Sequence, residues 1–278
     1  MTAPTHRRSP RPTGSPVRSR CLALLPIVFS PPLSLPMSPF PTMTRMIRLL
    51  PLLLLTGLSS LRAESEWRPW LDKITARLGN SLTPAQRSGL GQPPVRSVTG
   101  KTPALETMGK QVVVSDAALD LWGRLATAIG RDNRVPGYLA EYLRRCTETP
   151  DGVPALPDPS EIPSKKARKP VTDDRNQQLT AFNQLAATLV ATELVRASLG
   201  GSTEPGARTD ALALETLREG TRLAARSGYT SEALQSLVAA LPAGAPAPAW
   251  SQSFLPPKTL GPALAKEIKK VERKALGR

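Results

Sequence analysis

The sequence contains a single histidine, His6, which lies in a stretch rich in proline and arginine near the N-terminus. Zinc hydrolases, Ser-His-Asp triads and Cys-His nucleophiles all need imidazole as a metal ligand or as a base. The sequence also has no Ser-x-x-Lys motif and no glycine-rich phosphate loop after a strand. We therefore expect a protein that is not an enzyme and has no catalytic residue, cofactor or metal.

Long hydrophobic runs are missing as well. The longest apolar run covers residues 49–58 and contains Pro51 and Gly57, whereas a transmembrane helix needs about 20 apolar residues. Arg45 and Arg48 precede the run, and small or neutral residues follow it up to Ala63. This order of parts is typical of a secretory signal peptide. We expect a signal peptide at residues 43–63, cleaved after Ala63, and hence an exported, periplasmic or secreted protein.

Residues 1–42 contain no acidic side chain and are rich in Pro, Ser, Thr and Arg. We interpret them as a disordered extension, or as residues upstream of a true translation start at Met43 or Met46. The same composition also suits an organelle transit peptide or, as a third choice, a basic tail of a cytosolic protein.

The net charge of +15 is unevenly distributed along the chain. Residues 1–63 contribute eight arginines and no acid, so the remaining 215 residues carry 29 basic and 22 acidic side chains, a net charge of +7. Of this surplus, +5 lies in the last 21 residues. Because the body is nearly neutral, binding to nucleic acid is not favoured, whereas the basic C-terminus is suited to phosphates, anionic lipid or an acidic wall polymer.

Cysteine and aromatic residues are scarce, since the chain has two Cys and 4% aromatics. Cys21 would be lost with the leader, which leaves Cys146 without a partner for an internal disulfide. A single thiol in a secreted chain is either buried or paired between molecules. Cys146 lies on an apolar stripe with Tyr138, Leu139, Tyr142 and Leu143, which favours burial.

Helical periodicity dominates the mature part of the chain. Ser115 is suited to cap a helix over 116–130, and Thr172 to cap a long helix that ends at Gly200. Only residues 111–114 resemble a strand. We predict a mainly α protein, an irregular bundle of about six helices joined by proline-rich linkers, with no substantial sheet. The expected organisation is an extension (1–42), a signal peptide (43–63), an N-terminal helical segment (64–148), a linker (149–171), a helical core (172–242), a second linker (243–258) and a basic amphipathic helix (259–278).

Two carboxylates, Glu193 and Glu215, lie in the stretches "NQLAATLVATELVRASLGG" and "TDALALETLREGTRLAARSGYTSEAL". Together these stretches resemble the active helix and the downstream acidic helix of an M48-type zinc peptidase. Thr192 and Arg196 occupy the positions where that motif has histidines, so the resemblance implies a catalytically inactive module with a cleft lined by both carboxylates. Without the resemblance, these are two amphipathic helices. Because a carboxylate is costly to bury unpaired, either the apolar stripe of the first helix frays at Glu193, which is the commoner case, or Glu193 has a partner.

Our first hypothesis is an exported, non-enzymatic helical protein of the bacterial envelope. The partner would be envelope polymer, anionic lipid or another envelope protein, contacted through the basic residues of the last helix: Lys266, Lys269, Lys270, Arg273 and Lys274. The alternatives are the inactive peptidase-like module and, if residues 1–63 are retained, a basic protein associated with nucleic acid. The basic run "SKKARK" at 164–169 is interpreted as a solvated linker.

Overall fold

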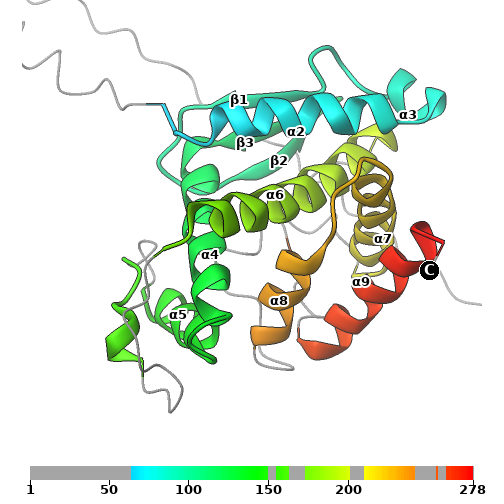
Figure 1. Ribbon diagram of the computed structural model, residues 1–278. Helices are drawn as coiled ribbons and strands as arrows, with labels where there is room; N and C mark the ends of the chain where they lie inside the picture. Colours follow the sequence, from blue (N-terminus) through cyan, green and yellow to red (C-terminus); the bar gives the residue numbers. More distant parts are fainter. Residues whose placement is uncertain are drawn as a thin grey trace, which may run out of the picture. The chain divides into compact units, whose positions relative to one another are not determined.

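The computed structural model describes residues 64–149, 155–162, 173–200, 210–241, 255 and 261–277, all of which belong to one unit spanning Ser59–Arg278. The predicted extension, signal peptide and basic run 164–169 lie outside the described residues, as does most of the two linkers. The described part contains eight α-helices, three strands and one short 3-10 helix, shown in Figure 1. In chain order these are α2 (Arg68–Ser81), α3 (Pro84–Ser88), β1 (Val95–Val98), β2 (Leu105–Met108), β3 (Gln111–Ser115), α4 (Asp116–Asp132), α5 (Tyr138–Glu148), η3 (Pro159–Glu161), α6 (Arg175–Ser198), α7 (Asp210–Arg226), α8 (Glu232–Ala240) and α9 (Pro262–Ala275).

The mainly helical class is confirmed, and the expectation of no substantial sheet is corrected by a small sheet that is present. A three-stranded sheet has the order β1-β3-β2, with β1 parallel and β2 antiparallel to β3. The strand-like run 111–114 forms the central strand, whose Val112 and Val114 are fully buried. Its neighbours have only four residues each. Such short strands follow prolines and carry little periodicity of their own, so their pairing with β3 is what forms them.

Helix α6 is the centre of the fold (Figure 1). It packs against α2, α3, α4, α7 and α8 and also against strands β2 and β3. Side chains on all its faces are therefore buried between Ala181 and Ala197, apart from Asn183 and Gln184, which are half-buried. A helix that is enclosed on every side has no solvent-facing stripe, which explains why a one-sided apolar pattern describes it poorly.

The starts of α4 and α6 are fixed by side-chain caps. Ser115 caps α4 as predicted, since its hydroxyl accepts a hydrogen bond from the Ala118 N–H at 3.2 Å. The cap of α6, in contrast, is Asp174 and not Thr172: the Asp174 carboxylate accepts hydrogen bonds from the N–H groups of Asn176 and Gln177 at 3.0 and 3.3 Å. A carboxylate at this position also interacts favourably with the helix dipole.

The first described residues are anchored in the core by Trp67. Its ring stacks on Phe182 of α6 with 4.3 Å between the ring centroids and is covered by the Arg175 guanidinium, 4.8 Å from its centroid. On the α4 side it fills a notch at Gly123, where an added Cβ would lie 2.4 Å from the indole. Trp67 thus joins the start of the described chain to α4 and α6.

Candidate functional site

All five basic residues predicted to contact an anionic surface are exposed on α9: Lys266, Lys269, Lys270, Arg273 and Lys274. The opposite side of the helix is buried through Leu264, Ile268, Val271 and Glu272. No ion pair to any of the five cations occurs within the described residues. Their charges therefore remain available on the outer face of α9.

The two acids of α9 are both bound to neighbouring helices. Glu272 is only 8% exposed, and its Oε2 accepts hydrogen bonds from Ser231 Oγ at 2.5 Å and from Gln235 Nε2 at 2.8 Å. Glu267 accepts a hydrogen bond from Arg218 Nε of α7 at 3.0 Å. Both carboxylates thus bind α9 to the neighbouring helices, Glu272 in the core and Glu267 in an ion pair at the border of the cationic face.

The pocket that α9 borders lies on its inner side, against α7. Its lining is mainly apolar and consists of Leu214, Leu217, Arg218, Thr221, Leu264, Glu267, Ile268 and Val271. The Arg218–Glu267 ion pair lies within the same lining. This pocket belongs to the packing of α9 on the body, and the exposed cations do not line it.

Glu193 lies in the core with partners, so the second of the two alternatives applies and the apolar stripe does not fray there. The residue is 1% exposed. Thr107 Oγ1 of β2 donates to its Oε2 at 2.9 Å, and Arg196 Nη2 lies 3.3 Å from its Oε1. Arg196 is itself 4% exposed and donates to Thr216 Oγ1 of α7 at 3.4 Å. Glu193 and Arg196 form a buried ion pair at the junction of α6, α7 and β2.

Glu215, the second candidate cleft carboxylate, is exposed on α7. Residues of an open cleft are accessible to solvent, but Glu193 is enclosed, so the structure does not place the two carboxylates in one cleft. Helices α6 and α7 are in fact tightly packed: at Gly220 an added Cβ would lie 2.4 Å from Thr192 Oγ1 and 2.5 Å from Thr192 Cα. In addition, no group of three or more His, Cys, Asp or Glu side chains within the described residues is arranged to hold a metal ion.

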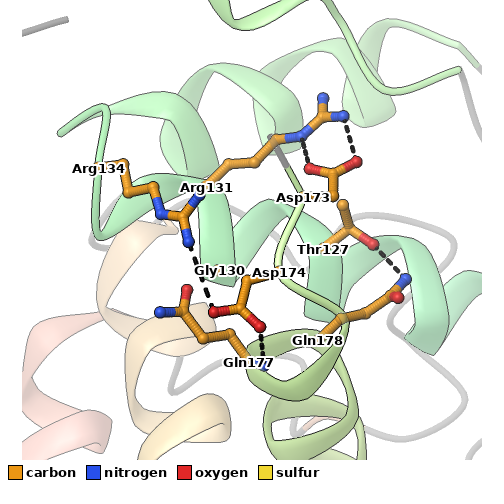
Figure 2. Close-up of a pocket in the computed structure, with 8 residues that line it drawn as sticks. All are labelled: Thr127, Gly130, Arg131, Arg134, Asp173, Asp174, Gln177 and Gln178. Atoms are coloured by element: carbon orange, nitrogen blue, oxygen red, sulfur yellow. Dashed lines mark hydrogen bonds and ion pairs between the residues drawn. The ribbon is translucent and has the colours of Figure 1, made fainter. Parts of the chain in front are cut away.

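A polar surface pocket separates the end of α4 from the start of α6 (Figure 2). Its charged groups are paired with one another: Asp173 binds Arg131 through both oxygens, at 2.7 and 2.8 Å, and Asp174 lies 3.6 Å from Arg134 Nη2. The Arg131 guanidinium lowers the pKa of Asp173 below its ordinary value. These contacts hold α4 against α6 and leave the pocket without a net charge.

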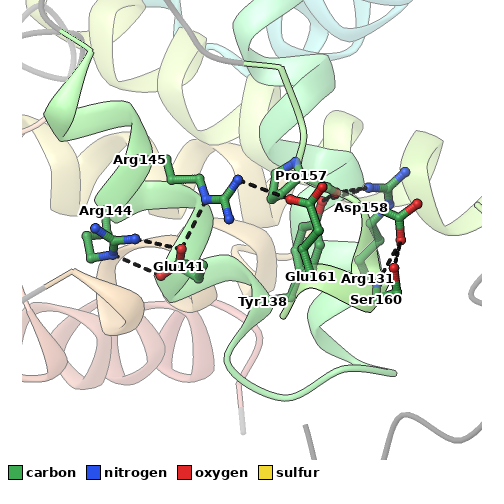
Figure 3. A network of polar contacts seen from close by, with 9 residues as sticks. All are labelled: Arg131, Tyr138, Glu141, Arg144, Arg145, Pro157, Asp158, Ser160 and Glu161. Atoms are coloured by element: carbon green, nitrogen blue, oxygen red, sulfur yellow. Dashed lines mark hydrogen bonds and ion pairs between the residues drawn. The ribbon is translucent and has the colours of Figure 1, made fainter. Parts of the chain in front are cut away.

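Arg131 also attaches the described part of the first linker to the body (Figure 3). Its Nη1 donates to Tyr138 Oη at 2.6 Å and to the Pro157 carbonyl at 3.0 Å, and Tyr138 Oη donates to the same carbonyl at 2.6 Å. Burial raises the pKa of Tyr138. Pro157 and Ile162 are buried, so residues 155–162 pack against the body, where Pro157 contacts α4 and α5.

Beside this network lies an exposed cluster on α5 that sequence reasoning did not single out. Glu141 accepts hydrogen bonds from Arg144 and from Arg145, which also pairs with Glu161 at 3.3 Å. The two arginines lower the pKa of Glu141 to about 2. In the sequence, this cluster is indicated only by the spacing of three and four residues between its charged side chains on α5. Such spacings are typical of ion pairs on a solvated helix face.

Cys146 is 3% exposed and is a free thiol. Burial is the main reason why its pKa is raised to about 11, and a neighbouring side chain, Tyr142, is buried with it. The expectation of a buried thiol is confirmed. Nucleophilic chemistry requires the thiolate, which this environment disfavours.

None of the helices within the described residues has the length and apolar character needed to cross a membrane. Comparison of the chain with protein-family models, with curated proteins and with solved structures finds no match. The candidate site therefore rests on the geometry of the chain itself, and its most distinctive feature is the outer face of α9.

Proposed function

We propose that the protein is an exported, non-enzymatic helical protein of the bacterial envelope that attaches to an anionic component through α9. The observation that carries this proposal is the separation of charge on that helix. Five exposed cations lie on its outer face, while Glu267 and Glu272 are bound to α7 and α8. An unpaired cationic face on an otherwise nearly neutral body attracts polyanions and is screened by salt.

Export is supported by the signal-peptide pattern at 43–63 and is compatible with the fold. A mature chain that begins at Glu64 keeps Trp67 in its place between Gly123 and Phe182. It also keeps the hydrogen bond from Ser65 Oγ to Asp120 Oδ1 at 2.6 Å and the pairing of Arg68 with Asp116. Cleavage after Ala63 therefore removes none of these contacts.

The first experiment is the intact mass of the protein purified from its own cells. A chain that begins near Glu64 supports export and leaves a net charge of about +7, computed from the composition. A chain that begins at Met1 contradicts export and favours the alternative hypothesis, a protein associated with nucleic acid.

The second experiment tests the role of α9 by substitution, so that the helix itself is retained. Replacing its five exposed cations with glutamine should release the protein from the envelope fraction at low salt, where the parent protein is retained. The matched control changes five exposed cations elsewhere: Lys73, Arg77, Arg96, Lys101 and Lys110. Equal retention of the α9 variant and the control would refute the proposed attachment.

A further inference from the structure

The direction and the shape of the cationic face indicate which kind of anionic component it fits. Successive residues of an α-helix are rotated by about 100°, so Lys266, Lys269, Lys270, Arg273 and Lys274 spread over an arc of about 140°. The buried residues Leu264, Ile268, Val271 and Glu272 are centred on the opposite side. The cations therefore project directly away from the body, along about 12 Å of helix from Lys266 to Lys274.

Such an outward, convex ridge suits a flat surface better than a single polymer strand. A strand is normally held in a groove with aromatic side chains or hydrogen-bonding groups along it. The described residues of the outer face of α9 supply flexible basic side chains and no aromatic one, and a pocket that borders this helix is on its inner side. Long basic side chains on a convex ridge can, in contrast, all reach one plane.

An apolar side chain lies at the border of the same face. Leu276 follows Arg273 by three residues, so the two are neighbours on the helix surface, and Leu276 is 41% exposed. The large apolar residues within α9, Leu264, Ile268 and Val271, are buried against the body. Leu276, the C-cap residue of α9, is therefore the large apolar side chain at this face that is free to enter a lipid interface, and deeper insertion would require α9 to detach.

We propose that the anionic component is a lipid bilayer surface, on which α9 lies flat with its cations among the headgroups and Leu276 at the acyl boundary. This rests on the proposed function and names its partner. The attraction of each basic residue to an anionic leaflet adds to that of the others, which makes binding reversible and strongly dependent on salt. The body remains outside the bilayer, because the apolar face of α9 is already used in folding.

The test uses the mature protein and two probes: vesicles rich in phosphatidylglycerol and soluble long-chain polyphosphate. Leu276→Ser is the discriminating variant, because it changes apolar contact without changing charge. It should weaken binding to the vesicles about fivefold and leave binding to polyphosphate unchanged. Replacing the five cations should abolish binding to the anionic vesicles and to polyphosphate. Vesicles of pure phosphatidylcholine should bind neither the parent protein nor the variants.

Binding to polyphosphate without binding to the anionic vesicles would overturn the bilayer assignment and leave the proposed attachment to an envelope polyanion intact. Vesicle binding that Leu276→Ser does not change would overturn the placement of Leu276. If the proposed function itself is wrong, the result differs: replacing the five cations leaves retention in the envelope fraction unchanged.

Discussion

Glu272 on α9 and Ser231, the N-cap residue of α8, are joined by a hydrogen bond of 2.5 Å between Oε2 and Oγ. The same carboxylate oxygen accepts from Gln235 Nε2. A buried carboxylate with two donors from one neighbouring helix fixes the rotation of α9 about its own axis, because any turn of the helix would remove the charge from its partners. The outward direction of the five cations depends on this contact.

Glu272→Ala should therefore destabilise the protein by about 1–3 kcal/mol, because it leaves the Ser231 hydroxyl without its acceptor, removes one of the two acceptors of Gln235 Nε2 and removes side-chain packing. Urea unfolding followed by circular dichroism measures the change. Lys274→Ala, at an exposed position of the same helix, is the control and should change stability by less than about 0.5 kcal/mol. Similar effects for both variants would show that the Glu272 contact does not hold α9.

Gly220→Ala should destabilise the fold by about 2–3 kcal/mol, since the new methyl group would overlap the backbone and hydroxyl of Thr192 and push α7 away from α6. Gly79→Ala provides an opposite control, because no atom lies within 4 Å of the added Cβ there. In α2 the alanine should stabilise by about 0.5–1 kcal/mol. Thermal unfolding of the two variants should shift the midpoint in opposite directions.

The Arg68–Asp116 pair predicts a loss of stability in acid. Hydrogen bonding to Arg68 is the main cause that lowers the pKa of Asp116 from its ordinary value of 3.8. A carboxyl group whose pKa is lower in the folded state contributes stability above its unfolded pKa, and this contribution is lost as pH falls through the folded value. Asp116→Asn should lower stability near neutral pH by about 2 kcal/mol and flatten the fall in stability below pH about 4.

The free energy of unfolding measured between neutral pH and acid checks this expectation. Glu106→Gln, at an exposed site of β2 outside the described ion pairs, controls for the loss of one negative charge. An acid slope that Asp116→Asn leaves as steep as in the parent would assign the acid sensitivity to other carboxylates.

Cys146 should not react with a maleimide in the native protein and should react once the protein is unfolded in urea. Its side chain is 3% exposed, and burial raises its pKa to about 11. The reaction is therefore limited both by the access of the reagent to the sulfur and by the small fraction of thiolate. Mass spectrometry of the labelled protein counts the modified thiols. Rapid labelling without denaturant would place Cys146 at the surface and reopen the possibility of a disulfide between molecules.

Local signals in the sequence predict the features that depend on a single helix. The cap at Ser115, the apolar stripe that contains Cys146 and the two faces of α9 all follow from helical spacing. The exposed positions of the α9 cations agree with that spacing because α9 packs on the body along one side only. For such helices the periodic pattern contains nearly all the information needed.

Features that depend on distant residues were not predicted. Strand β1 exists because Val95 pairs with Val112, and no local pattern in residues 95–98 indicates a strand. Helix α3 is a different case, because its signal is local. Thr83 and Gln86 form a capping box around Pro84, which could have been recognised in the sequence, but the helix was not predicted. The burial of Glu193 needs Thr107, a residue of β2, so it could not be inferred while the sheet itself was unknown.

The stacking of Trp67 on Phe182 has a consequence for the order of folding. The two rings are 115 positions apart in the chain, and a contact between such distant residues forms only after the chain between them has been brought together. During translation the segment around Trp67 emerges before α6 and must wait for that helix before its indole has a partner. The residues around Trp67 are thus expected to become resistant to protease late, together with the centre of the protein.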